Sequence, residues 1–79
     1  MKARVIVTLK SGVLDPQGKA IEGALKGLAV DGLTSVRQGK VFDIELEGVE
    51  GDAASERVAQ ACEKLLANTL VENFVIQHG

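Results

Sequence analysis

Seventy-nine residues, 46% of them apolar and 25% charged, suffice for one small globular domain spanning 1–79. Nine basic and eleven acidic residues give a net charge of -2 without a basic stripe, which argues against nucleic acid as a ligand. A single cysteine excludes an internal disulfide, no apolar run is long enough for a bilayer, and the start is not signal-like, so we expect a cytoplasmic, non-membrane protein. With no Trp, no Tyr and two Phe, the core must be small and aliphatic, and oligomerisation is expected.

The first two predicted elements are a strand and a helix. Residues 2–9 alternate between two faces, which indicates a half-buried strand. Asp15 suits the N-cap of a following helix, and Pro16 suits its first position, where no N–H partner is needed. Apolar residues then recur with helical spacing, so we expect a helix from about 16 to 30.

The next segment, 33–47, permits two interpretations. Its apolar residues share one parity, and they are Val36, Phe42, Ile44 and Leu46. One interpretation is a single long strand, bent near Gly39, whose polar middle extends beyond the body of the domain. The other is a hairpin that turns at Gln38 and Gly39. The unbroken parity favours the long strand.

A second helix and a last strand complete the chain. Asp52 or Ser55 is expected to cap the helix, which should end near Asn68. Its predicted apolar face consists of Ala54, Val58, Ala61, Cys62, Leu65 and Leu66. Residues 70–77 are typical of a strand. We therefore predict an α+β fold, a small β-α-β-α-β domain with a long bent second strand and two helices packed on one sheet face; the alternative is a β-α-β-β-α-β ferredoxin-like fold.

No set of residues indicates catalysis, a cofactor site or a metal site. Cys62 lies on an apolar helix face and is expected to be structural. His78 is penultimate, where chains usually fray. Arg37 and Lys40 could meet a phosphate, but an exposed strand bend explains them equally well. Five acidic residues form a predicted solvated cluster, and they are Asp43, Glu45, Glu47, Glu50 and Asp52.

Four motifs, in order and over nearly the whole chain, resemble the PurS family, the small subunit of phosphoribosylformylglycinamidine synthase. The most specific is Leu9-Lys10-x-Gly-Val-Leu-Asp-Pro-Gln-Gly18. The other three are Ala20-Ile21-x-x-Ala24-Leu25, Val36-Arg37-x-Gly39-Lys40 and Cys62-x-x-Leu65-Leu66-Ala67-Asn68. The chain departs from the family at Thr69, where Pro is frequent, and at Phe74, where Tyr is common.

The resemblance implies a non-catalytic assembly subunit of an ATP-dependent, glutamine-using ligase in de novo purine biosynthesis. In the family, the glutaminase PurQ releases ammonia, and the synthetase PurL uses ATP and Mg²⁺. The small subunit forms a dimer or higher homo-oligomer and helps PurQ and PurL associate, with no cofactor of its own. A free-standing ligand-sensing module and an independent small enzyme are the alternatives, and neither has a supporting motif.

We predict that the residues contacting a partner or a second copy gather around the first helix start and the strand bend. Val13 and Leu14 are adjacent aliphatic residues in a loop that would normally be polar, and a hydrophobic staple onto Lys19 explains them poorly. Packing onto Ile21 is the alternative. The full set of predicted contact residues is Val13, Leu14, Asp15, Arg37, Lys40 and Val41.

Overall fold

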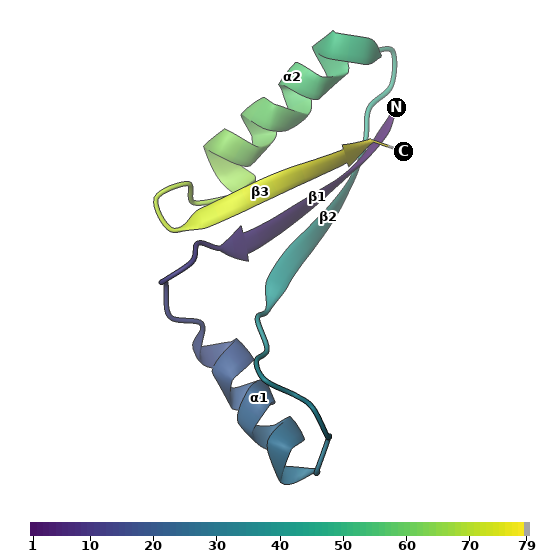
Figure 1. The fold of residues 1–79 in the computed structure, drawn as a ribbon. Coiled ribbons are helices and arrows are strands. Elements are labelled where there is room, and N and C mark those ends of the chain that lie inside the picture. Colours follow the sequence, from purple (N-terminus) through teal and green to yellow (C-terminus); the bar gives the residue numbers. More distant parts are fainter. Residues whose placement is uncertain (79) are drawn as a thin grey trace.

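The computed structural model describes residues 1–78, which form a three-stranded sheet and three helical elements (Figure 1). In chain order they are β1 (Lys2–Leu9), α1 (Pro16–Gly27), β2 (Gly39–Glu45), α2 (Gly51–Ala61), the π-helical turn η1 (Cys62–Leu66) and β3 (Glu72–His78). The predicted α+β class and the β-α-β-α-β order of strands and main helices are confirmed.

The sheet is antiparallel and has β1 in its centre, with strand order β2-β1-β3. Val5 of β1 lies opposite Phe42 of β2 and Ile76 of β3. Because opposite residues share a face, these three side chains point to the same side of the sheet. The alternate row, which includes Ile6 and Val41, points to the other side and has no helix over it (Figure 1).

The core lies between the sheet and α2. Ala54, Val58 and Cys62 recur every fourth residue, and this spacing presents them as one stripe to the sheet, where each is 1% exposed or less. The buried cluster is small and aliphatic, as predicted, and consists of Ala3, Val5, Val7, Val58, Cys62 and Ala67. Both phenylalanines pack at the rim of this cluster.

Both ends of α2 differ from the prediction. The helix begins at Gly51 after Glu50, without a side-chain cap from Asp52 or Ser55. At its other end, the N–H of Ala67 donates to the carbonyl of Cys62, five residues earlier, in the π turn η1. This wider turn rotates the predicted core residue Leu65 to the surface, where it is 83% exposed.

The first helix lies elsewhere than predicted. We expected both helices on one sheet face, but only α2 covers the sheet, and α1 lies beyond its end (Figure 1). The molecule accordingly measures 49 × 25 × 14 Å. Gly18 is the one buried residue of α1. Leu28, which directly follows the helix, is 75% exposed. Hydrogen bonds between α1 with its N-cap and residues 36–38, described below, hold the helix at this position.

The connection from α1 to β2 decides between the two interpretations of 33–47. The helix ends at Gly27, earlier than predicted, and the chain turns through Ala29, whose φ is +58°. Residues 33–38 then run back along α1 and continue into β2 without a hairpin (Figure 1). The long-strand interpretation holds in direction, although only Gly39–Glu45 pairs with β1.

The last strand also differs in detail. It begins at Glu72, later than predicted, and extends to His78. His78 is paired with Ala3 of β1, so it belongs to the sheet and is not part of a frayed end. Below, "the body" denotes the three strands with α2 and η1, and "the arm" denotes residues 14–38.

Candidate interaction site

Asp15 joins the two ends of the arm, at the start of α1 and just before β2. It caps α1 as predicted, because the backbone N–H of Gly18 donates to its Oδ1 at 2.9 Å. The backbone N–H of Gln38 donates to its Oδ2 at 2.7 Å. Asp15 is only 5% exposed. These N–H groups, that of Gln38 first, lower the pKa of the Asp15 carboxyl below its usual value.

Gly18 leaves the space that this arrangement requires. A Cβ atom at this position would lie against the Asp15 carboxylate and 2.7 Å from the carbonyl oxygen of Val36. Any side chain at position 18 would therefore push the returning segment of the arm, residues 33–38, away from α1. Sequence reasoning did not single out Gly18, although its place three residues after an N-cap aspartate was the available signal.

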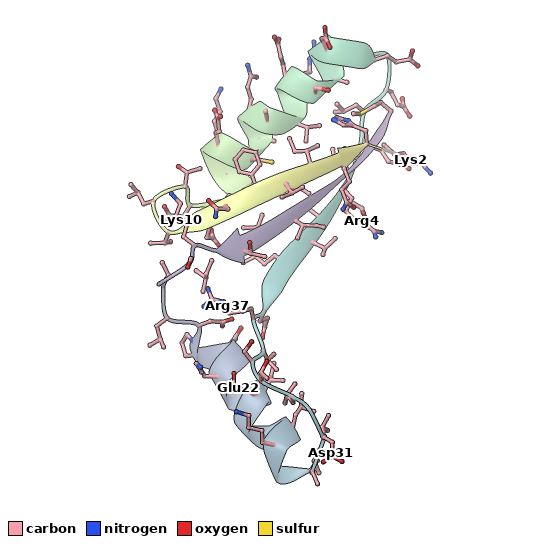
Figure 2. All side chains as sticks on the ribbon, viewed as in Figure 1. Lys2, Arg4, Lys10, Glu22, Asp31 and Arg37 are labelled. Carbon is pink, nitrogen blue, oxygen red and sulfur yellow. The ribbon has the colours of Figure 1, made fainter. Side chains whose placement is uncertain are left out.

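Glu22 is a second residue of the arm whose structural role sequence reasoning missed. Its Oε1 accepts from the backbone N–H of Val36 at 3.1 Å, and Glu22 (Figure 2) lies seven residues beyond Asp15 along the chain. Lys19 and Lys26 flank the carboxylate at 3.7 and 3.5 Å. The Val36 N–H is the main cause of the lowered pKa of Glu22, and the two lysines add to it. In the sequence, Glu22 resembles any charged residue on a solvated helix face.

Arg37 lies on the other side of the same segment, at the junction of arm and body (Figure 2). Its Nη1 donates to the carbonyl of Val13 at 3.3 Å. Its Nη2 donates to the carbonyls of Leu9 and Lys10 at 3.4 and 3.3 Å. The two terminal nitrogens of the guanidinium thus donate to three carbonyl groups at the end of β1 and in the β1–α1 loop.

A cleft of about 370 Å³ separates the start of α1 from the end of the sheet. Asp15 and Pro16 line its arm side, and Val7 and Lys40 line its body side. Lys40 Nζ lies 3.7 Å from a carboxylate oxygen of Glu72 across the sheet. Since Val7 points to the α2 side of the sheet, α1 begins on that same side.

The remaining predicted contact residues differ in exposure. Leu14 is 72% exposed, so packing onto Ile21 leaves most of its surface free. Val13 is half-buried, and its N–H donates to the carbonyl of Lys10 at 3.0 Å. Val41 is 57% exposed on the uncovered sheet face. The structure thus brings Val13, Asp15 and Arg37 together, and places Lys40 and Val41 just beyond them on β2.

Several titratable residues of the body are engaged locally. In the predicted acidic cluster, Asp43 pairs with Arg4 at 2.9 Å and Glu45 with Lys2 at 3.4 Å across neighbouring strands (Figure 2). The Arg4 hydrogen bond lowers the pKa of the Asp43 carboxyl. Cys62 is buried, and its burial raises the pKa of the thiol, which makes the reactive thiolate less accessible.

Within residues 1–78, His, Cys, Asp and Glu side chains form no cluster of three or more that could hold a metal ion. No helix in this range has both the length and the apolar character that crossing a bilayer requires.

Comparison with known proteins gives consistent matches over nearly the whole chain. The family model described as "PurS: Phosphoribosylformylglycinamidine (FGAM) synthase" matches residues 2–78. The PurS subunit of Mycobacterium leprae is 44% identical over 75 residues, covering 95% of this chain and 91% of that protein. The crystal structure of Methanocaldococcus jannaschii PurS has a TM-score of 0.84 at 39% identity and covers 96% of this chain and 92% of its own. A chain of the structure of PurLQS from Thermotoga maritima has a TM-score of 0.88 at 34% identity, with coverages of 96% and 93%.

Proposed function

Because the chain belongs to the PurS family of phosphoribosylformylglycinamidine synthase subunits, we propose that it is the small assembly subunit of that ligase in de novo purine biosynthesis. The match over residues 2–78 carries this proposal. We prefer this proposal to the two alternatives, a free-standing ligand-sensing module and an independent enzyme. The whole of 1–79 acts as a single PurS-like domain in the cytoplasm.

The partners proposed for this chain are a PurL-type and a PurQ-type subunit, together with further copies of itself. The Thermotoga maritima structure named for PurLQS supports this set, because its PurS-like chain shares this fold. In this proposal the glutaminase chemistry belongs to the PurQ-type subunit, and ATP and Mg²⁺ bind the PurL-type subunit. The chain itself contributes no catalytic, cofactor or metal residue.

The proposed contact surface consists of the six predicted residues, and we assign them two kinds of role. Leu14, Lys40 and Val41 present exposed surface that a partner can bury. Asp15, Arg37 and the half-buried Val13 act by holding the β1–α1 loop and the segment before β2 in place through their polar groups. Leu14 is 72% exposed beside this loop, so a partner that docks there can bury most of its side chain.

Reconstitution tests the proposed function. Adding the purified chain to PurL-type and PurQ-type subunits from the same organism should produce one complex by size-exclusion chromatography. It should also raise glutamine-dependent amidine formation, while the chain alone has no glutaminase or ligase turnover. Full activity of the two large subunits without this chain, or turnover by the chain alone, would contradict the proposal.

A matched pair of leucine variants tests the surface. Leu14→Ser should weaken assembly about tenfold with a nearly unchanged melting temperature, because little buried area is lost in the isolated chain. Leu65→Ser is the control, since Leu65 is 83% exposed but lies on η1 in the body. Equal binding by both variants would exclude Leu14 from the proposed contact surface.

A further inference from the structure

The first helix ends in a cap that fixes the chain as far as Val30. The N–H of Ala29 donates to the carbonyl of Lys26 at 3.1 Å, and the N–H of Val30 donates to the carbonyl of Leu25 at 3.3 Å. These two bonds, with Ala29 at a φ of +58°, are those of a Schellman motif. The chain is anchored again at Val36, whose N–H binds a carboxylate of α1.

Asp31 and Gly32 form an exposed turn between these two anchors, at the tip of the arm (Figure 2). Gly32 has a φ of +82°, and a Cβ atom added to it would have no neighbour within 4 Å. Within residues 1–78, no hydrogen bond or ion pair engages the Asp31 carboxyl group or the Gly32 N–H. The side chain of Asp31 and the nitrogen that follows it can therefore approach each other without breaking a contact.

We propose that the Asp31–Gly32 linkage is a site of spontaneous isoaspartate formation, and that the modified tip is a substrate for an isoaspartate-specific carboxyl methyltransferase. The Gly32 nitrogen attacks Cγ of the protonated Asp31 carboxyl group, the N–Cγ bond forms, and water leaves. The product is a five-membered succinimide ring. Water that opens this ring at Cγ restores aspartate, whereas water that opens it at the main-chain carbonyl leaves a backbone that runs through Cγ. The proposal is independent of the proposed function.

The methyltransferase step acts on the carboxylate that this rearrangement sets free. A sulfonium donor transfers its methyl group to the main-chain carboxylate of the isoaspartate and leaves as a thioether. The Gly32 nitrogen then attacks the resulting ester, methanol leaves, and the succinimide ring forms again. Repeated opening of the ring returns part of the chain to aspartate at each cycle, so the tip can be repaired without breaking the main chain.

The other aspartates of the chain are in positions that oppose the reaction. Asp15 precedes Pro16, whose nitrogen has no proton to lose, and its carboxylate accepts from two N–H groups. Asp43 is bound by Arg4 and lies in β2. Asp52 lies in the first turn of α2. Ring closure requires rotation about the Cα–C bond of the aspartate, and regular secondary structure opposes this rotation.

The two asparagines can form the same ring with loss of ammonia, and they are also held. Asn73 lies in β3 opposite Thr8. The side-chain oxygen of Asn68 accepts from the N–H of Leu70 at 3.2 Å, and the β-branched Thr69 crowds the nitrogen that would attack. The tip of the arm thus combines an exposed carboxyl group, a nitrogen without a neighbouring Cβ and a backbone outside any strand or helix.

The modification should loosen the arm. Isoaspartate adds one carbon atom, about 1.5 Å of chain, between α1 and the returning segment. Because the Schellman motif fixes Val30, the added length shifts residues 33–38 relative to the helix. The hydrogen bond from the Val36 N–H to Glu22 should weaken as a result.

Storage of the full chain in neutral buffer for several weeks tests the site. Isoaspartate is measured as methyl groups accepted from a labelled donor with the purified methyltransferase. It is located by peptide mapping with an endoproteinase that cleaves before aspartate and not before isoaspartate. Asp31 should be converted about tenfold more than Asp43 or Asp52. Equal conversion at the three positions, or no methyl acceptance by the stored chain, would overturn the inference.

Two variants separate the chemistry of the tip from the accuracy of the assay. Asp31→Glu retains the charge but would have to close a six-membered ring, so methyl acceptance at this position should disappear. Asp31→Asn forms the five-membered ring with loss of ammonia and should convert about tenfold faster than the unmodified chain, at a similar rate in the folded chain and in denaturant. Conversion of folded Asp31→Asn at less than a tenth of its rate in denaturant would show that the turn prevents ring closure.

Hydrogen exchange tests the effect on the arm. In the stored, modified chain the Val36 amide should exchange about threefold faster than in the fresh chain, whereas the amides of β1 should exchange at unchanged rates. An unchanged rate at Val36 in the modified chain would overturn the proposed loosening of the arm.

Discussion

The body and the arm of this molecule are stabilised by different interactions. In the body, Val5, Val58 and Cys62 are 1% exposed or less, and α2 covers the sheet through apolar contacts. In the arm, the only fully buried side chain is the carboxylate of Asp15, and the returning segment is held by hydrogen bonds to Asp15 and Glu22. Removing volume should therefore weaken the body, whereas removing charge or adding volume at α1 should weaken the arm.

The largest effect is expected in the core. Val58→Ala should lower the free energy of unfolding by about 2 kcal/mol, because it removes buried methyl groups and leaves a cavity. For a chain of this length that corresponds to a fall of about 10 °C in melting temperature. Leu28→Ala in the arm is the control, and in dilute solution it should change stability by less than about 0.5 kcal/mol. Similar losses for both variants would show that the arm has an apolar core of its own.

Two glycines of α1 provide the next comparison. Gly23→Ala should stabilise the chain by about 0.5–1 kcal/mol, because nothing lies within 4 Å of the added Cβ and alanine favours the helix. Gly18→Ala has the same propensity gain, yet it should destabilise, since its Cβ meets the Asp15 carboxylate and the Val36 carbonyl. Thermal melts of both variants measure the difference. An equal gain at Gly18 would mean that the returning segment is not held closely to α1.

Acidification should release the arm before the body. The pKa values of Asp15 and Glu22 are lowered from ordinary values of 3.8 and 4.5, so their contribution is fully present above about pH 5. It is lost as the pH falls below those ordinary values through the lowered ones. Hydrogen exchange at the Val36 and Gln38 amides should therefore accelerate below about pH 4 relative to that of β1. Uniform acceleration along the chain would contradict separate stabilisation of the arm.

A charge-neutral variant separates the carboxylate from the cap. Asp15→Asn retains one acceptor oxygen for the N-cap, but its amide nitrogen cannot accept from a second N–H. The variant should lower the melting temperature by about 5 °C at pH 7, and the difference should be smaller near pH 3, because below the ordinary pKa of an aspartate the unfolded chain binds the proton first. A constant difference at both values would assign the effect to shape and not to charge.

The smallest effect concerns Cys62. Because burial raises the pKa of its thiol, alkylation at pH 8 should be at least tenfold slower in the folded chain than in denaturant. Arm variants such as Glu22→Gln should leave this rate unchanged, since Cys62 belongs to the body. Fast alkylation of the folded chain would mean that α2 separates readily from the sheet.

The sequence predicted the body well because its signals are local. The alternation of residues 2–9 gave β1 with its observed bounds, and the spacing of Ala54, Val58 and Cys62 gave the buried face of α2. Asp15 and Pro16 likewise marked the start of α1 correctly. The prediction that Leu65 is buried failed, because the π turn holds one residue more than an α-helical turn and rotates this side chain to the surface.

The arm could be predicted only in part. Its six proposed contact residues lie around one junction, but Glu22 and Gly18 were missed. Their roles depend on the backbone of Val36 and Gln38, fourteen or more residues away along the chain. No short-range pattern encodes a carboxylate that binds a distant N–H group, whereas an N-cap is encoded within three residues.

By itself, the sequence determined the fold class, the order of the elements, the aliphatic character of the core and the PurS resemblance, because each of these follows from periodicity, composition or a contiguous motif. Only the tertiary structure decided that α1 leaves the sheet and that residues 33–38 run on into β2 without a hairpin. These outcomes depend on which distant groups satisfy the backbone of residues 36–38. That choice is made by Asp15, Glu22 and the space at Gly18 acting together.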